Sequence, residues 1–397
     1  MIITGLDIGT ANIKTLVCQK KPKKSQVEVL AQLKEISSGV RKGVIINPEE
    51  VSKIIKSSIE RAQELSKENI DSVLVNVGGA HIFFTNSHGL ISVSRADQKI
   101  SQEDIGRVIQ AAQTFSLPSN IEILSVIPRE FIIDGERGIK EPLGLKGVRL
   151  EVEASILGGF SPYLKNLTKA VLNSGLQIDD LILNPLASAQ AVLSPREKEI
   201  GVLLLDIGAG TTSLAVFEEE ELIYTTIFPV GSVHITNDIA VGLKCDIDTA
   251  EEIKLEYGTL FFKGPEKKRK IETVEGETLI FSQKMLSRII EARVGEIFEI
   301  VNKELKKIAK QGKLPAGVVL TGGGAKLPRI KELAKKELRL HCRIGLPKGF
   351  SPSLEDPQLA TVAGLVLMGL EIEQEKSFSF FGGLISKLKK IFRIFLP

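Results

Sequence analysis

One local pattern occurs twice in this chain, about 200 residues apart, and it constrains the fold more than any other feature. Residues 3–10 (ITGLDIGT) form an apolar, strand-like run that ends in an Asp-x-Gly turn, and a second strand-like run follows at 13–18. Residues 201–212 (GVLLLDIGAGTT) and 213–217 repeat this arrangement. An Asp-x-Gly turn between two β-rich runs fits a hairpin whose backbone is bare enough to approach an anion. The repeat predicts an α/β protein with two related halves.

Each half also contains a second strand that ends in glycines and follows a helix-like segment. The strands are 73–79 (VLVNVGG) and 318–324 (VVLTGGG). Asn47, Pro48 and Glu50 have the character of an N-cap, a first helical residue and a capping acid. Helical spacing predicts an apolar face on the helix that follows Asn47 and on a second helix at 282–310. The two faces consist of Val51, Ile54, Ile55, Ile59, Ala62 and Leu65, and of Leu286, Ile289, Ile290, Val294, Ile297, Phe298, Val301 and Leu305. Two α/β halves of the same plan predict a ligand cleft between them.

Two insertions interrupt the halves and set the expected domain boundaries. We expect the first half at 1–80 and 161–195, the first insertion at 81–160, the second half at 196–232 and 283–370, the second insertion at 233–282, a linker at 371–376 and a C-terminal helix at 377–397. The first insertion has a helix-like segment at 101–114 and strand-like runs at 121–127, 130–133 and 149–157. The second has a helix at 249–257 and a basic stretch at 267–270, which we interpret as a solvated loop and not as a nucleic-acid patch.

Charge and cysteine usage exclude several classes of protein. The net charge is +3, but five basic residues and no acidic ones lie from Lys376 onward, so the rest of the chain carries −2. This balance argues against a nucleic-acid-binding body. The cysteines Cys18, Cys245 and Cys342 lack metal-ligand or redox spacing and fit a reducing cytoplasm. No signal-peptide pattern is visible, and the apolar stretch 359–370 is too short to span a bilayer, so we expect a buried helix there.

Glycine-rich turns can hold phosphates because their backbone N–H groups point inward and no side chain blocks the approach. A single Asp-x-Gly-Thr turn is usually an ordinary tight hairpin. Two copies, at 7–10 and 206–212, and a third glycine turn at 322–324 favour a nucleotide cleft in which a triphosphate is held from both sides. We expect Asp7 and Asp206 to hold Mg²⁺ through its water ligands, since magnesium keeps several waters in phosphate sites. Lys14 adds positive charge near the phosphates.

Several segments resemble a known family. The pattern is similar to that of the actin, sugar-kinase and heat-shock ATPase superfamily, and within it the chain resembles the FtsA family of bacterial cell-division proteins. The matching segments are 43–47 (GVIIN), 86–89 (NSHG), 127–135 (IPREFIIDG), 147–150 (GVRL), 184–189 (NPLASA), 250–254 (AEEIK) and 321–325 (TGGGA), and the resemblance covers nearly the whole chain. It implies duplicated actin-like, ribonuclease-H-like domains with a nucleotide cleft between them.

The resemblance also implies roles for individual residues. It places Asp7, Gly9, Thr10 and Lys14 in a first phosphate loop, Gly208, Gly210, Thr211 and Thr212 in a second, and Asp7 and Asp206 beside Mg²⁺. Glu251 and Lys254 match positions that contact the adenosine and ribose of ATP, and Gly323 and Gly324, which follow Gly322, match positions under the base. Gln190 matches a position that orients the attacking water, although a polar residue on a helix surface is an equally good interpretation. No residue is an obvious base for a second substrate, which favours simple ATP binding or weak hydrolysis over kinase chemistry.

The C-terminal segment, 377–397, can be interpreted from its own pattern. At about 100° per residue, its apolar side chains fall in one arc and its basic residues lie outside that arc. The apolar set is Phe381, Leu384, Ile385, Leu388, Ile391, Phe392, Phe395 and Leu396, and the basic set is Lys387, Lys389, Lys390 and Arg393. Such a helix lies in a membrane interface with its cations at anionic lipid headgroups. Docking on the protein's own core or in a partner's groove are the alternatives. The FtsA family is similar in this respect, because its members end in a membrane-targeting helix.

The leading hypothesis is an ATP-dependent, actin-like adaptor on the cytoplasmic face of the inner membrane at the division septum. By resemblance, it polymerises, anchors filaments of the tubulin-like protein FtsZ and recruits later division proteins. Arg288 and Arg293 are candidate contacts for an acidic FtsZ C-terminal peptide, although exposed helix arginines often bind nothing specific. The alternatives are a PilM-like protein of type IV pilus assembly and a small-molecule kinase of the same fold. The C-terminal segment discriminates best between these hypotheses.

Overall fold

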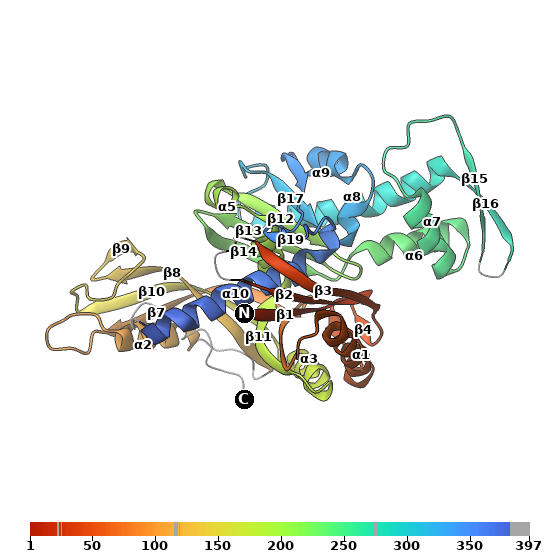
Figure 1. Ribbon diagram of the computed structural model, residues 1–397. Coiled ribbons are helices and arrows are strands. Elements are labelled where there is room, and N and C mark those ends of the chain that lie inside the picture. Colours follow the sequence, from red (N-terminus) through yellow and green to blue (C-terminus); the bar gives the residue numbers. More distant parts are fainter. Residues whose placement is uncertain (22–23, 25, 115–117, 119, 274–275, 382–397) are drawn as a thin grey trace. The chain divides into compact units, whose positions relative to one another are not determined.

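The computed structural model describes residues 1–21, 24, 26–114, 118, 120–273 and 276–381, and the side chains up to residue 373 within the last range (Figure 1). The chain divides into two compact units. The larger consists of Met1–Ala80 and Asn166–Met368, and the smaller of His81–Lys165, to which the last part of helix α10 from Gly369 is assigned. Both phosphate-loop sequences lie in the larger unit.

The first sheet of the larger unit has six strands in the order β11-β6-β1-β2-β3-β19. Its first five are Gln177–Leu183 (β11), Ser72–Val77 (β6), Ile2–Ile8 (β1), Asn12–Gln19 (β2) and Val27–Ile36 (β3). β1 and β2 form the predicted hairpin, in which Asp7 lies opposite Lys14. A two-strand ribbon, β4 (Val40–Arg41) and β5 (Val44–Ile45), follows β3. Residues 3–8 of β1 are all buried, as expected for a central strand between covering helices.

Helix α1 (Pro48–Ser66) begins where its capping sequence predicts. The Asn47 side chain accepts a hydrogen bond from the Glu50 N–H, and Pro48 occupies the first helical position. α1 packs on β2 and β3 through its predicted apolar face, of which Val51, Ile55, Ile59 and Ala62 are buried. Leu65, in the last turn of α1, was predicted on this face but is exposed.

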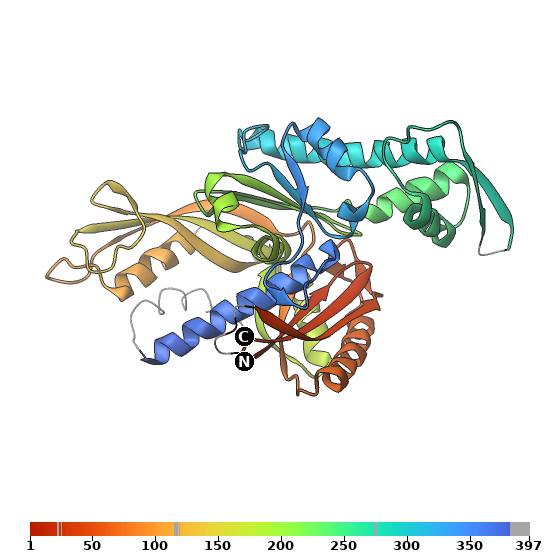
Figure 2. The ribbon, with the colours of Figure 1, turned by 45° about the horizontal axis from the view of Figure 1, so that its top comes forward.

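The second sheet repeats the topology of the first. Its order is β14-β13-β12-β17-β18, formed by Glu221–Phe228, Thr212–Glu218, Val202–Ile207, Val318–Thr321 and Cys342–Ile344. In both sheets the hairpin partner of the central strand is antiparallel and its other neighbour is parallel. Helices α8 (Gln283–Lys307) and α9 (Ile330–Leu338) lie beside this sheet (Figure 2) and supply its core. All of the predicted α8 face except the half-buried Ile289 is buried. The sequence repeat is therefore a repeat of topology.

Two segments that follow the second half along the chain pack against the first half. The sequence predicted neither contact, although it did predict a buried helix at 359–370. Strand β19 (Phe350–Ser351) pairs in parallel with β3, and the Val27 N–H donates to the Gly349 carbonyl at 2.8 Å. Helix α10 (Ala360–Phe381) packs on the first sheet, since a Cβ on Gly5 would lie 2.9 Å from the Val362 carbonyl oxygen. Residues beyond β18, which were expected in the second half up to residue 370, therefore also contribute to the packing of the first sheet. The predicted linker at 371–376 is also helical, because its residues (EIEQEK) are good helix formers that continue α10.

Helix α4 (Asn184–Val192) and the short helix α5 (Pro195–Ile200) join the halves. The guanidinium of Arg343, on β18, donates to both carboxylate oxygens of Glu197, from Nε at 2.7 Å and from Nη2 at 2.8 Å, and Nη2 also donates to the Val192 carbonyl at 2.9 Å. Burial favours the protonated form of Glu197, but hydrogen bonds from Arg343 and Ser194 outweigh it and lower the pKa of this carboxyl to about 2. Arg343 thereby ties the joining segment to the second sheet.

We expect Glu197→Gln to lower the free energy of unfolding at pH 7 by roughly 1 kcal/mol, a value typical of a partly exposed ion pair. The pKa of Glu197 is lower in the folded chain than its ordinary value of 4.5, so the stabilisation is present above about pH 4.5 and is lost as the pH falls toward 2. Urea unfolding of both chains from pH 7 to pH 3 measures this effect. The two unfolding midpoints should approach each other below about pH 4.5, and a constant difference would contradict the assigned pKa.

The second insertion consists of α6 (Ser232–Leu243), α7 (Ile247–Tyr257) and the hairpin β15 (Lys268–Glu272) and β16 (Thr278–Ser282) beside the first half of α8. The basic stretch predicted as a solvated loop is mostly strand β15. Arg269 donates to the Gln283 side chain at 3.1 Å, and its guanidinium lies 5.2 Å from the Tyr257 ring centroid. These contacts hold the basic strand against α7 and the first residue of α8.

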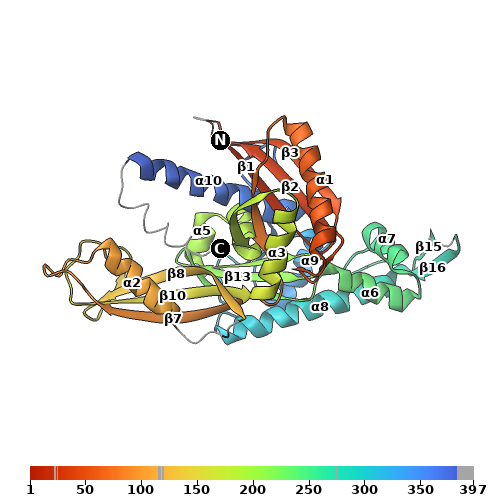
Figure 3. The same ribbon diagram turned by 90° about the horizontal axis from the view of Figure 1, so that it is seen from below.

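The smaller unit contains a four-stranded sheet, β7-β10-β8-β9, with α2 (Gln102–Gln113) on one face (Figure 3). The strands are Phe83–Ser92, Arg149–Phe160, Ile121–Ile133 and Glu136–Ile139. α2 begins with a capping box between Ser101 and Asp104, and it buries Ile105, Val108 and Ile109 against the sheet. The two strands predicted at 121–127 and 130–133 are one strand, β8, because Pro128 lies at a register shift that absorbs its missing N–H.

Candidate functional site

The two predicted phosphate loops have the same backbone closure. The Gly9 N–H donates to the Asn12 carbonyl at 3.0 Å, and the Gly208 N–H donates to the Thr211 carbonyl at 2.9 Å. Each loop connects the central strand of its sheet to the antiparallel neighbour. The hairpins predicted from the repeat are therefore present, and equivalent turns stand at equivalent places in the two halves.

These loops approach each other closely. A Cβ on Gly210 would lie 2.6 Å from Thr10 Oγ1, so only a glycine fits opposite this threonine. Thr10 Oγ1 also accepts a hydrogen bond from the Gly43 N–H at 2.9 Å. Gly43 has a positive φ of 74°, and a Cβ there would lie 2.9 Å from the Gly79 backbone nitrogen and 3.2 Å from Thr211 Cγ2. Four backbone segments with glycine or a short side chain thus meet in one place, at Thr10, Gly43, Gly79 and residues 210–211.

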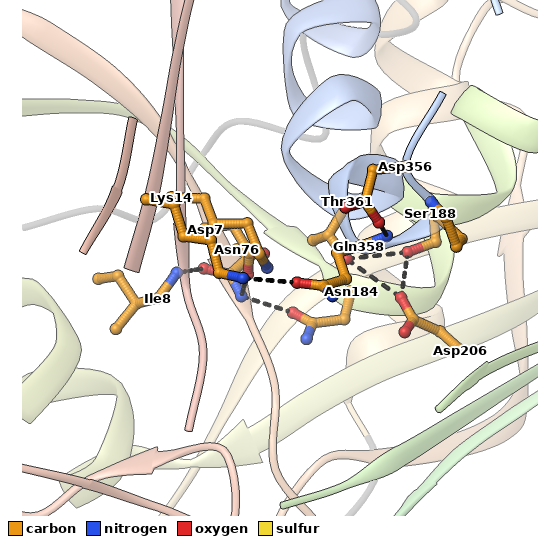
Figure 4. A network of polar contacts seen from close by, with 12 residues as sticks. Asp7, Ile8, Lys14, Asn76, Asn184, Ser188, Asp206, Asp356, Gln358 and Thr361 are labelled. Atoms are coloured by element: carbon orange, nitrogen blue, oxygen red, sulfur yellow. Dashed lines mark hydrogen bonds and ion pairs between the residues drawn. The ribbon is translucent and has the colours of Figure 1, made fainter. Parts of the chain in front are cut away.

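Asp7 lies at the end of β1 with both carboxylate oxygens engaged (Figure 4). Lys14 Nζ donates to its Oδ2 at 2.6 Å, and Asn76 Nδ2 donates to its Oδ1 at 2.8 Å. The Asn76 orientation is fixed because its Oδ1 accepts the Ile8 N–H at 2.6 Å. Lys14 therefore approaches the first loop as predicted, and it does so as the partner of Asp7.

Asp206 occupies the equivalent place on β12 but has no adjacent lysine. Its Oδ2 accepts hydrogen bonds from Ser188 Oγ at 2.6 Å and Thr361 Oγ1 at 3.1 Å. Burial raises the pKa of Asp206; the hydrogen bond from Ser188 opposes that rise, and the negative charge of Asp7 adds to it. Two buried carboxylates near each other favour the uptake of a cation. They suit a hydrated Mg²⁺ whose other ligands come from a phosphate chain, and no group of three or more acidic, His or Cys side chains that could hold a metal alone occurs among the described residues.

The third glycine turn supports Asp206. Gly322 has a positive φ of 79°, and a Cβ there would lie 2.3 Å from Asp206 Oδ1. A Cβ on Gly324 would lie 2.4 Å from Ile207 Cγ2, so this glycine packs on the strand that enters the second loop. Gly323 begins a short 3₁₀ helix beside Gln358. The turn that was predicted to lie under the base thus packs directly on Asp206 and Ile207, at the end of β12 where the second loop begins.

Helix α6 begins against the second loop, and α7 carries the predicted adenosine residues to the same place. The Ser232 N–H donates to the Gly208 carbonyl and the Val233 N–H to the Ala209 carbonyl, both at 2.9 Å. Lys254 Nζ donates to the Ser232 carbonyl at 3.4 Å and to the carboxylate of Glu251 at 2.5 Å. Glu251 and Lys254 therefore lie as a pair at the first turn of α6, beside the second phosphate loop.

Three other groups of predicted residues lie apart from this cluster or outside the description. Gln190 is about 200° around α4 from Ser188, and its amide accepts a hydrogen bond from Lys198 at 3.2 Å. Arg293 forms a two-bond ion pair with Asp238 at 2.6 and 2.9 Å and also pairs with Glu296, whereas Arg288 is exposed and forms no ion pair with any residue of the described ranges. The predicted membrane residues Leu384, Ile385, Lys387, Leu388, Lys390, Ile391, Phe392, Arg393 and Phe395 lie outside the described residues, as does the side chain of Phe381.

Four residues of the cluster had no role in the sequence interpretation: Asn76, Asn184, Ser188 and Thr361. Asn76 carried a signal, since it is the one polar residue in the apolar run VLVNV. Asn184 and Ser188 lie in the segment NPLASA, which supported the family resemblance without an assigned contact. Thr361 offered no local signal, because its partner Asp206 is 155 residues away.

No helix among the described residues is long and apolar enough to cross a bilayer.

Comparison with known protein families gives matches in both units. The profile described as cell division protein FtsA matches residues 203–364, and the profile of the SHS2 domain inserted in FtsA matches residues 79–157. The FtsA cell-division protein of Pseudomonas aeruginosa is 36% identical over 380 residues, which cover 94% of this chain and 90% of that protein. The FtsA protein of Borreliella burgdorferi is 38% identical over 404 residues, which cover 98% of this chain and 94% of that protein.

Solved structures with the same architecture are more distant in sequence. A PilM–PilN type IV pilus biogenesis complex matches with a TM-score of 0.67 at 17% identity, covering 93% of this chain and 98% of the other. MreB5 of Spiroplasma citri bound to ADP matches with a TM-score of 0.57 at 15% identity, covering 96% and 99%. These likenesses establish the actin-like fold alone. The near full-length relatives and the matching profiles go further: the chain belongs to the FtsA family of cell-division proteins.

Proposed function

We propose that this protein binds Mg²⁺–ATP between its two halves and uses the bound nucleotide to form filaments on the cytoplasmic face of the inner membrane. The observation that carries the proposal is the convergence of two equivalent loops, in which Gly210 lies against Thr10 and each loop brings one buried aspartate. Backbone of this kind approaches phosphates closely, and the aspartates supply negative charge for a hydrated cation. Glu251 and Lys254 lie on α7 beside the first turn of α6, and they are the proposed contacts of the adenosine moiety.

The role of the nucleotide is chiefly structural in this proposal. Phosphoryl transfer depends on positioning and charge stabilisation, and a triphosphate held by both halves links them. Lys14 reaches Asp7 at 2.6 Å, so it adds a cation at the same loop. Gln190, whose amide bonds to Lys198, is a weak candidate for orienting a water, which agrees with at most slow hydrolysis.

The division role of the family leads to the second part of the proposal. The protein anchors FtsZ filaments at the septum through its segment 377–397, whose apolar and basic faces suit an anionic bilayer. It also presents Arg288 to the acidic C-terminal peptide of FtsZ. Of the two predicted arginines, Arg293 is already bound to Asp238, whereas Arg288 is exposed on α8. The recruitment of later division proteins belongs to the same proposal.

Co-sedimentation with vesicles that contain anionic lipid tests this function. The full chain should sediment with the vesicles and coat them as filaments when Mg²⁺–ATP is present, and it should carry FtsZ into the pellet. A chain ending at Phe381 keeps every described residue and should stay in solution, as should a full-length Ile391→Glu, Phe392→Glu variant. Arg288→Glu should still sediment but should carry less FtsZ, while Arg293→Lys serves as its matched control. Vesicle binding by the shortened chain, or filaments that form equally well without nucleotide, would refute the corresponding part of the proposal.

A further inference from the structure

Helix α4 connects the two loop aspartates through side chains one turn apart. Asn184, at the beginning of α4, accepts a hydrogen bond from Asn76 Nδ2 at 3.0 Å, and the same amide group donates to Asp7 at 2.8 Å. Ser188, four residues further along α4, donates to Asp206 at 2.6 Å. Residues four apart lie on the same face of a helix, about 6 Å apart along its axis. One rigid turn of α4 therefore stands between a carboxylate of the first half and a carboxylate of the second (Figure 4).

The second carboxylate is held by two hydroxyl groups that also contact each other. Ser188 Oγ and Thr361 Oγ1 are 2.9 Å apart, and both are within hydrogen-bond distance of Asp206 Oδ2. Each hydroxyl has one proton, so Ser188 donates to the carboxylate and Thr361 donates to the carboxylate or to Ser188. Ser188 is fully buried and Thr361 is 6% exposed, so water does not replace either group easily. On the other side, a Cβ on Gly322 would lie 2.3 Å from Asp206 Oδ1, so a larger residue there would displace the carboxylate.

Close packing keeps this arrangement rigid. α4 and α10 cross where Gly364 lies against the Ala187 carbonyl, next to Ser188 on one helix and three residues after Thr361 on the other. Asn76 has both of its amide atoms engaged, with Ile8 on one side and Asp7 and Asn184 on the other. Neither carboxylate can move by a large distance without leaving a buried donor or acceptor unpaired, which is unfavourable.

We infer that Asn184, Ser188 and Thr361 are positioning residues that set the distance and orientation of Asp7 and Asp206 for a hydrated Mg²⁺ held with the nucleotide. This inference rests on the proposed nucleotide function and specifies how the cation is accommodated in it. The residues do not touch the nucleotide; they act through the carboxylates. Outer partners of this kind orient the groups that hold a metal, and their loss usually lowers metal affinity by about 10- to 100-fold.

The affinity for ATP, measured with Mg²⁺ and again with EDTA in place of Mg²⁺, separates this role from a merely structural one. The ratio of the two dissociation constants reports how much Mg²⁺ contributes to the affinity for ATP. We expect Ser188→Ala and Thr361→Val to reduce that contribution about tenfold while the Mg²⁺-free affinity changes little. Thr361→Ser retains the hydroxyl and should behave as the wild type. Asn184→Ala should reduce the contribution of Mg²⁺ in the same direction as Ser188→Ala.

Ser58→Ala is the matched control for lost buried hydrogen bonding. Ser58 is fully buried and its hydroxyl lies 2.8 Å from that of Thr15, and neither hydroxyl is hydrogen-bonded to Asp7 or Asp206. This variant should lower stability without altering the effect of Mg²⁺.

Should Ser188→Ala fail to fold, the Thr361→Val and Thr361→Ser pair decides the question alone. An unchanged Mg²⁺ contribution in Thr361→Val, or an equal loss in Ser58→Ala, would overturn the inference. Wild-type chain that binds ATP without any effect of Mg²⁺ would overturn the inference and the cation part of the proposed function, but not nucleotide binding. Wild-type chain that binds no ATP would overturn nucleotide binding itself.

Discussion

Gly364→Ala is expected to destabilise the protein by more than about 3 kcal/mol, the upper part of the range for overpacked cores. A Cβ on Gly364 would lie 1.7 Å from the Ala187 carbonyl oxygen and 2.3 Å from its carbon. These atoms belong to the backbone of α4, so no side-chain rotation can relieve the overlap and the two helices must separate. Urea unfolding followed by far-UV circular dichroism measures the effect, and low soluble yield of the variant would be its first sign.

Gly295→Ala is the control for this prediction. Gly295 lies in the middle of α8, and a Cβ there would meet nothing within 4 Å. The substitution should stabilise the protein by about 0.5–1 kcal/mol, because alanine loses less backbone entropy than glycine on entering a helix. A small effect of Gly364→Ala, similar in size to that of Gly295→Ala, would show that α4 and α10 do not cross as closely as described.

Gly210→Ala is expected to weaken ATP binding on the order of 100-fold, since displacements of about 1 Å in a preorganised site have effects of that size. The new methyl group would lie 2.6 Å from Thr10 Oγ1 and 2.9 Å from Thr10 Cγ2, so the two loops must move apart. The fold should survive, because Thr10 is a short side chain at the edge of the core and can shift. Titration with a fluorescent ATP analogue gives the affinity, and thermal unfolding checks that the variant is folded.

A double-mutant cycle with Thr10→Ala identifies the cause of this loss. Thr10→Ala removes Oγ1 and Cγ2, the two atoms nearest to the new methyl group, but it also removes the acceptor of the Gly43 N–H. If the clash is responsible, the double variant should bind ATP no more weakly than Thr10→Ala alone, which is strongly non-additive behaviour. Additive losses would mean that the two loops do not oppose each other across the nucleotide.

Local patterns predicted much of the fold. The two hairpins, the capped start of α1 at Asn47, helix α2 and the long helix α8 all form within a few residues of the predicted positions. Each is specified by contacts between neighbours in sequence: alternation in the strands, helical spacing in the helices, and side-chain caps. The errors fall where a local pattern is ambiguous. Pro128 suggested a break in β8, and the basic stretch that became β15 suggested a loop.

The candidate site also contains residues that local patterns predicted and residues that they did not. The loop residues could be recognised because a glycine-rich turn after a buried strand has a chemical meaning of its own, and the structure brings Thr10 and Gly210 together. The groups that hold Asp206 could not be recognised in this way. Ser188 is an ordinary small residue of a helix, and Thr361 is a helix residue outside any recognisable motif. Only their hydrogen bonds to Asp206 give them a role.

The sequence alone determined the duplicated plan, the family and the positions of the two glycine-rich turns, because these depend on residues that are close along the chain. Only the tertiary structure decided that β19 returns to the first sheet, that α10 crosses α4 at Gly364, and that Asn184 and Ser188 lie between the two carboxylates. Such contacts join residues far apart along the chain, and their stability depends on close packing and on the satisfaction of buried polar groups in the folded whole. No local pattern encodes that balance.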